Sequence, residues 1–150
     1  MLLSKGFPMK ILRHASAFWK GDVPTGTGAM TLGRDGQVLP FTLKARVEDN
    51  AGTNPEELVG AALVGCYSMA LSSLIEEAGK VPGTVETSAN VIMEQLPDGF
   101  AITEIQLTTR GKDQDLTNDE FVALATKAKT GCPISKLYAS ANITLDAALA

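Results

Sequence analysis

Residues 54–77, which read NPEELVGAALVGCYSMALSSLIEE, decide the fold of this chain. Asn54 can cap a helix, Pro55 suits its first position, and the two glutamates that follow complement the positive end of the helix dipole. Residues 58–75 then carry no charged side chain. A helix that is apolar on every side is buried on every side, so this stretch is predicted to form the central helix of the fold.

The segments on either side of this helix carry strand and turn signals. Apolar runs separated by Gly, Pro and Asp clusters predict strands at residues 11–19, 27–32, 41–48, 85–96, 100–109 and 142–145. The turn sequence PDG at 97–99 joins two of these strands as an antiparallel pair. An amphipathic helix capped by Asn118 is predicted at 119–129, and a short helix at 133–138. Because strands and helices do not alternate strictly, the predicted fold class is α+β.

The composition is that of a soluble globular domain. The chain has 150 residues, 45% of them hydrophobic and 20% charged, which is enough for one domain with its own core. The net charge of −4 and the scattered lysines and arginines argue against a nucleic-acid surface. No membrane span or secretory signal is predicted, so we expect a cytoplasmic protein with reduced thiols. Residues 1–8 can be an N-terminal extension, with Met9 as the alternative start.

The two cysteines, Cys66 and Cys132, are the candidates for chemistry. Free cysteines are often small core residues, which is the simplest interpretation of this pair. A structural zinc site needs four ligands, and the chain offers only these cysteines and His14, so no metal is predicted. Cys132 precedes Pro133 at a predicted helix start, where backbone N–H groups and nearby lysines stabilise a thiolate. The apolar helix around Cys66 disfavours a thiolate. The residues alone therefore favour Cys132 as the attacking thiol.

Several motifs resemble those of a known family. Residues 53–58 read TNPEEL, residues 65–71 read GCYSMAL, and residues 130–135 read TGCPIS. Together they resemble the osmotically inducible protein C and organic hydroperoxide resistance (OsmC/Ohr) proteins, and WKGD at 19–22 and ITLD at 143–146 resemble the OsmC branch. The resemblance covers nearly the whole chain. It implies a single OsmC-like α+β domain in an intertwined homodimer, with antiparallel sheets packed around the long buried central helix and active sites at the subunit interface.

The resemblance also implies an enzyme of oxidative and osmotic stress defence that reduces organic hydroperoxides, and hydrogen peroxide less well. In that mechanism Cys66 is the peroxidatic cysteine and Cys132 the resolving one, which reverses the prediction from local sequence. The two form a transient disulfide, which an external dithiol, such as a lipoyl group, reduces. No metal, haem or other cofactor takes part.

An arginine and a glutamate hold and activate the first thiolate in this family. Glu56 matches the glutamate of the TNPE motif, and Arg46 matches the arginine of the OsmC branch. Glu56 and Cys66 are ten residues apart, roughly 15 Å along one helix, so Glu56 is expected to serve the site of the partner subunit. The alternative for Glu56 is a contribution to the helix dipole alone. Alternation along 41–48 predicts Arg46 on the polar face of a strand, and Arg34, in a turn, is the reserve candidate.

Two other functions fit the same residues. A redox-sensing stress protein would form the disulfide but turn over slowly with any dithiol. A non-enzymatic binder of a small hydrophobic ligand would keep both cysteines buried and inert. Alkylation at neutral pH separates the binder from the other two, because an activated thiolate reacts fast and a core thiol does not.

Overall fold

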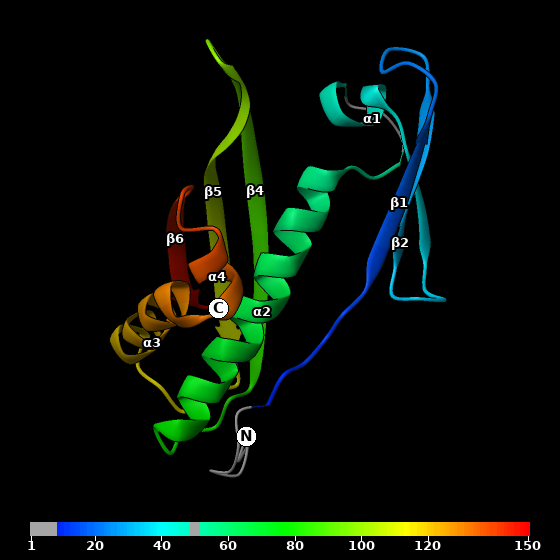
Figure 1. Ribbon diagram of the computed structural model, residues 1–150. Coiled ribbons are helices and arrows are strands. Elements are labelled where there is room, and N and C mark those ends of the chain that lie inside the picture. Colours follow the sequence, from blue (N-terminus) through cyan, green and yellow to red (C-terminus); the bar gives the residue numbers. More distant parts are fainter. Residues whose placement is uncertain (1–8, 49–51) are drawn as a thin grey trace. The chain divides into compact units, whose positions relative to one another are not determined.

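The computed structural model describes residues 9–48 and 52–150, and the chain divides into two compact units (Figure 1). The first unit ends at Pro55, and the second runs from Glu56 to Ala150. Each unit has its own three-stranded sheet. Antiparallel pairing and a long central helix confirm the predicted α+β class.

The first unit is an antiparallel sheet followed by a short helix. The turn between its first two strands is fixed by Asp22, whose carboxylate accepts hydrogen bonds from the backbone N–H and the hydroxyl of Thr25 at 2.9 and 2.5 Å. The second strand has the predicted bounds, whereas the first begins at Ala15 rather than at Ile11. In chain order the elements are β1 (Ala15–Lys20), β2 (Thr27–Leu32), β3 (Val38–Phe41) and α1 (Leu43–Val47).

The strand predicted at residues 41–48 is wrong, because α1 occupies most of this stretch. Thr42 caps the helix, and its Oγ1 accepts a hydrogen bond from the N–H of Ala45 at 3.2 Å. The helix itself begins Leu-Lys-Ala-Arg, and all four are strong helix formers. Cap and propensity together outweigh the alternating pattern. Arg46 therefore lies on a helix, and its predicted place on the polar face of a strand is wrong as well.

The second unit has a sheet in the order β4-β5-β6. As predicted, β4 and β5 form a long antiparallel hairpin, and Gly99 after the turn takes a φ of 130° that favours glycine. The last strand pairs with β5 in parallel, with Ile143 opposite Ile105. The elements are α2 (Pro55–Glu77), β4 (Thr84–Leu96), β5 (Gly99–Lys112), α3 (Asn118–Gly131), α4 (Pro133–Leu137) and β6 (Asn142–Leu149).

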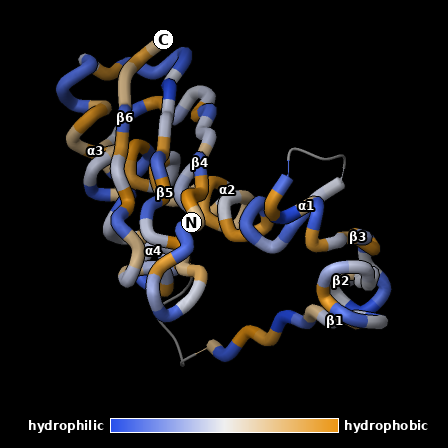
Figure 2. The backbone as a smooth tube through the Cα atoms, turned by 90° about the horizontal axis from the view of Figure 1, so that it is seen from above, coloured by the Kyte–Doolittle hydropathy of each residue, from blue (hydrophilic) through white to orange (hydrophobic). Residues whose placement is uncertain are grey.

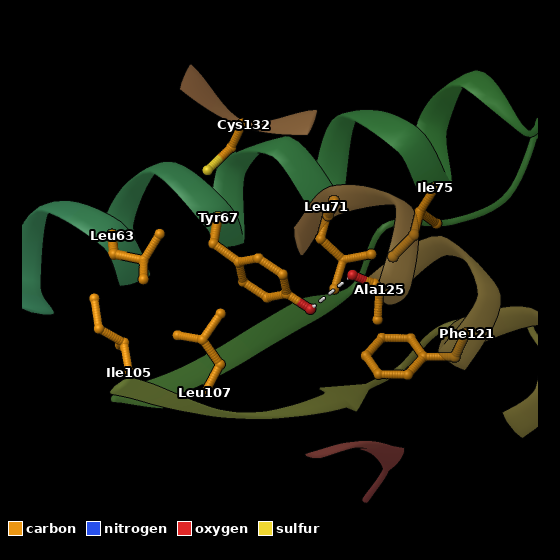
Figure 3. Close-up of a cluster of buried hydrophobic side chains, with 10 residues drawn as sticks. Leu63, Tyr67, Leu71, Ile75, Ile105, Leu107, Phe121, Ala125 and Cys132 are labelled. Carbon is orange, nitrogen blue, oxygen red and sulfur yellow. Dashed lines mark hydrogen bonds between the residues drawn. The ribbon is translucent and has the colours of Figure 1, made fainter. Parts of the chain in front are cut away.

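One face of α2 forms the core of the second unit, and Figure 1 shows the helix lying across the β4-β5 hairpin. The residues of this face recur every three or four positions and are buried: Gly60, Leu63, Tyr67, Leu71 and Ile75. They pack against side chains of β5 and α3 (Figure 3), namely Ile105, Leu107, Phe121 and Ala125. This packing fixes which side of α2 meets the sheet and which side is left outside the core.

The opposite face of α2 is exposed and apolar, and Figure 2 colours part of this helix as hydrophobic. It carries small residues and a methionine that is 70% exposed, namely Ala61, Ala62, Gly65 and Met69. The predicted burial on every side is therefore wrong for the single chain. By length and composition alone α2 could cross a membrane, which the sequence-based prediction excluded. One face of α2 is nevertheless fully buried against the rest of the unit, as in a core helix.

A side chain caps the N-terminus of α3. Thr117, rather than the predicted Asn118, caps α3: its Oγ1 accepts from the N–H of Glu120 at 3.2 Å, and the Glu120 carboxylate accepts from the N–H of Thr117 at 2.8 Å. Asn118 instead accepts a hydrogen bond from the N–H of Leu149 at 2.9 Å. The last strand is therefore tied to α3 and runs to Leu149, beyond its predicted end at Leu145.

Candidate active site

The fold of the second unit brings Cys66 and Cys132 together, although they are far apart in the sequence. Cys66 lies in the middle of α2, and Cys132 lies in the link between α3 and α4. The Cys132 thiol is close enough to Cys66 to raise its pKa, and both are free thiols. Cys66 is half-buried, whereas Cys132 is only 1% exposed. Two adjacent thiols of unequal exposure can form a disulfide.

Cys132 caps α4 with its own sulfur. Its Sγ accepts a hydrogen bond from the N–H of Ser135 at 3.3 Å, and the Ser135 Oγ lies 2.9 Å from the same sulfur. Pro133 takes the first helical position, as the sequence predicts. An N–H group and a hydroxyl directed at one sulfur stabilise its thiolate. Sequence reasoning missed Ser135, although the spacing between a cap and the third helical residue could have indicated it.

Cys66 has a less favourable environment for a thiolate. Burial raises the pKa of the Cys66 thiol above its ordinary value, and the neighbouring Cys132 raises it further, whereas the backbone N–H of Ile134 lowers it. The net direction is upward, so at neutral pH these surroundings favour the thiol over the thiolate. A cation beside Cys66 is needed to reverse this balance.

Tyr67 follows Cys66 in the chain and points into the core. Its Oη donates a hydrogen bond to the carbonyl oxygen of Ala125 on α3 at 3.2 Å (Figure 3). Burial raises the pKa of Tyr67, and the nearby Cys132 raises it further, so the phenol stays neutral. The hydrogen bond ties the turn of α2 that carries Cys66 to the helix that precedes Cys132.

A chain of hydrogen-bonded hydroxyl groups connects α2 to the sheet close to Cys66. Ser68 Oγ donates to Thr87 Oγ1 at 2.8 Å, and the hydroxyls of Thr87 and Thr109 are 3.0 Å apart. Thr109 is fully buried on β5. These bonds resist rotation of α2 about its axis, which holds Cys66 on the side of Cys132.

Arg46 belongs to the first unit and lies on α1 with an exposed side chain. It lines an apolar cavity of about 130 Å³ together with Trp19, Phe41 and Leu43. The rings of Trp19 and Phe41 form one wall, with their centroids 5.4 Å apart. Arg46 is therefore a cation at the edge of an apolar hollow, and its pairing with Cys66 stays a prediction.

Glu56 lies in the first turn of α2 and is 9% exposed. Along this helix it is roughly 15 Å from Cys66, so it does not contact Cys66 of the same chain. Arg34 lies in the exposed turn between β2 and β3, directly after Gly33, whose φ is 71°. This is the geometry of a solvated turn residue. Within residues 9–48 and 52–150, no three His, Cys, Asp or Glu side chains gather as metal ligands.

Comparison with known proteins identifies the family of this chain. The family model described as OsmC-like protein matches residues 48–147. The chain belongs to this family. This OsmC-like protein is 40% identical to the Peroxiredoxin OsmC of Escherichia coli (strain K12), over 92% of its own length and 96% of that relative. The family predicted from the sequence motifs is thereby confirmed.

Solved structures of related proteins have the same fold. The crystal structure of the organic hydroperoxide resistance protein OhrB of Bacillus subtilis superposes on this OsmC-like chain with a TM-score of 0.68 at 25% identity, covering 91% of this chain and 98% of OhrB. An organic hydroperoxide resistance protein OsmC from Legionella pneumophila gives a TM-score of 0.72 at 22% identity, covering 93% and 99%. The α+β architecture is therefore that of OsmC and Ohr proteins.

Proposed function

We propose that this protein is a thiol-dependent peroxidase that reduces organic hydroperoxides, and hydrogen peroxide less well. The observation that carries the proposal is the pairing of two free thiols, Cys66 and Cys132, inside one unit of an OsmC-like fold. The similarity to a peroxiredoxin and to organic hydroperoxide resistance proteins supports the same chemistry. The reaction needs only the two sulfurs, a peroxide and a reductant.

Three steps make up the catalytic cycle. The Cys66 thiolate attacks one oxygen of the peroxide, the O–O bond breaks, and the alcohol leaves after taking up a proton. Cys66 is then a sulfenic acid, and Cys132 attacks its sulfur and expels water to form the disulfide. An external dithiol, of the lipoyl type, reduces the disulfide and becomes a disulfide itself.

The difference in exposure supports Cys66 as the peroxidatic residue. Cys66 is half-buried and keeps part of its surface exposed, whereas Cys132 is 1% exposed and held by Ser135. A peroxide therefore meets Cys66 first. The contacts with Ser135 hold the Cys132 sulfur in place for the second step, in which it attacks the sulfenic acid.

Arg46 and Glu56 complete the proposed site. The raised pKa of Cys66 calls for a cation, and Arg46 is the family-matched candidate, with Glu56 to orient it. Glu56 lies too far along α2 to serve Cys66 of its own chain, which supports a site built from two subunits. A homodimer also accounts for the exposed apolar face of α2, since a second copy of that face would cover it.

The cellular setting follows from the chemistry. We propose that the two units form one OsmC-like domain, because the family match at residues 48–147 begins in the first and runs through the second. Free thiols that cycle through a disulfide suit the cytoplasm, where reductants are abundant. The protein acts there as a soluble enzyme of stress defence.

Mass spectrometry after a stoichiometric pulse of cumene hydroperoxide tests the function. We expect a disulfide between Cys66 and Cys132 within seconds, and a trapped sulfenic acid on Cys66 in a Cys132→Ser variant. A sulfenic acid on Cys132 in the matching Cys66→Ser variant, together with none on Cys66 in the Cys132→Ser variant, would reverse the two roles. No oxidation of either cysteine would contradict the peroxidase and leave the binding of a hydrophobic ligand as the function.

A further inference from the structure

A cavity of about 410 Å³ lies beside the end of α3, α4 and the start of β6, in the second unit. Its polar lining consists of two lysines and two hydroxyls, from Lys129, Thr130, Ser135 and Lys136. The rest of the lining is apolar, contributed by two alanines and by Ile143. The volume is enough for a small organic molecule.

The charged side chains that line this cavity are both positive. No acidic side chain lines it, and in the described part of the chain neither Lys129 nor Lys136 forms a hydrogen bond or ion pair through its ammonium group. The protein as a whole carries a net charge of −4, so two unpaired cations in one hollow are a local exception. Such a site attracts an anion.

Ser135 connects this cavity to the redox pair. It lines the cavity, and its Oγ lies 2.9 Å from the sulfur of Cys132. Neither Cys66 nor Cys132 is among the lining residues, so Ser135 stands between the cavity and the Cys132 sulfur. A molecule in the cavity can therefore reach the Cys132 sulfur only when the Ser135 side chain moves aside, and this side chain rotates about a single bond.

We propose that this cavity admits the reductant, and that Lys129 and Lys136 select a dithiol that carries a negative charge. The inference rests on the proposed peroxidase function, and it assigns the reductive step to a different opening from the oxidative one. The peroxide reaches the half-buried Cys66, whereas the dithiol approaches through the lysine-lined cavity to Cys132.

The reductive step is ordinary thiol–disulfide exchange. One thiolate of the dithiol attacks the sulfur of Cys132, the bond to Cys66 breaks, and Cys66 leaves as a thiolate. The second thiolate of the dithiol then attacks its own sulfur that is bound to Cys132 and closes a cyclic disulfide. Cys132 is released with the electron pair, and both cysteines are reduced.

Two dithiols that differ only in charge test the inference. Dihydrolipoate and dihydrolipoamide share the same dithiol and chain, but only the first carries a carboxylate. The oxidised protein is mixed with each, and recovery of free thiols is followed by quenching and labelling. In a Lys129→Gln/Lys136→Gln variant, the second-order rate with dihydrolipoate should fall about fivefold, as expected for the loss of exposed charge pairs. The rate with dihydrolipoamide should stay unchanged.

Lys127→Gln is the matched control, because Lys127 lies on the same helix outside the cavity lining. It should leave both rates unchanged. An equal fall with both dithiols in the double variant would mean that the lysines act on the cysteine sulfurs, and no fall would mean that the reductant enters elsewhere. Either result overturns the inference.

The same samples separate this inference from the proposed function. Disulfide formation with cumene hydroperoxide is measured first, in the wild type and in the double variant, so that an effect of the lysines on the cysteines themselves is separated from their effect on the reductant. If peroxide gives no disulfide in the wild type, the peroxidase function fails. The disulfide is then made with diamide, so that the charge selectivity of its reduction is still measured.

Discussion

At the scale of single residues, the two thiols lie in different surroundings. The sulfur of Cys132 accepts a hydrogen bond from the N–H of Ser135 and lies 2.9 Å from its hydroxyl oxygen, whereas burial raises the pKa of Cys66. A raised thiol pKa means that the thiolate is lost as the pH falls, so Cys66 should react faster at alkaline than at neutral pH unless a cation lowers its pKa. Arg46 is the residue proposed to do this.

Replacing Arg46 with Ala should therefore slow the oxidation of Cys66 at neutral pH and move its pH profile upward. Each unit by which the thiol pKa rises costs about tenfold in thiolate near neutral pH, so we expect a loss of about tenfold or more. Stopped-flow mixing with cumene hydroperoxide between pH 6 and 10 measures it. Lys44→Ala, an exposed cation on the same helix, is the control and should keep the wild-type profile. A wild-type profile in the Arg46→Ala variant would remove Arg46 from the site.

Ser135 should act on the second step of the cycle. Ser135→Ala removes the hydroxyl that lies 2.9 Å from the Cys132 sulfur and leaves the backbone N–H in place. A lost hydrogen bond of about 1 kcal/mol predicts disulfide formation about fivefold slower, with sulfenic acid on Cys66 accumulating. Rapid quenching with dimedone measures the trapped acid, and Ser140→Ala, an exposed serine beyond α4, is the control. If the acid does not accumulate, the Ser135 hydroxyl has no part in resolution.

At the scale of elements, local signals decided what the sequence could reveal. The acidic first turn of α2, the hairpin at 97–99 and the Cys132-Pro133 helix start depend on neighbouring residues, and all three were predicted. The stretch 41–48 failed because its alternation mimics a strand while its cap and propensities favour a helix. The closeness of Cys66 to Cys132 depends on long-range packing, which no spacing encodes.

The capping box of α3 gives a test at this scale. Thr117→Ala should lower the free energy of unfolding by about 1 kcal/mol, because it leaves the N–H of Glu120 without its acceptor. Urea denaturation followed by circular dichroism measures the change. Thr126→Ala, in the exposed middle of the same helix, should be neutral or slightly stabilising, since alanine is the better helix former. Equal effects of the two substitutions would refute a special role for the cap.

At the scale of the whole molecule, the uncovered face of α2 is the feature that the single chain does not explain. An added Cβ at Gly65 would meet nothing within 4 Å, so the chain itself accommodates a larger residue there. Gly65→Leu should therefore leave the fold intact and even favour the helix, because glycine is a poor helix former by about 1 kcal/mol. In a homodimer the same side chain would hold two α2 helices apart.

We accordingly expect Gly65→Leu to weaken the dimer, raising its dissociation constant about tenfold or more, as for a bulky change at the centre of an interface. Peroxidase activity should fall in proportion to the monomer fraction, because Glu56 then has no partner site to serve. Analytical ultracentrifugation across a concentration series gives the monomer fraction, and Ala123→Leu on the exposed side of α3 is the control. A Gly65→Leu protein that is monomeric and fully active would show that one chain holds the complete site; a stable, active dimer would show that the subunits meet through another surface.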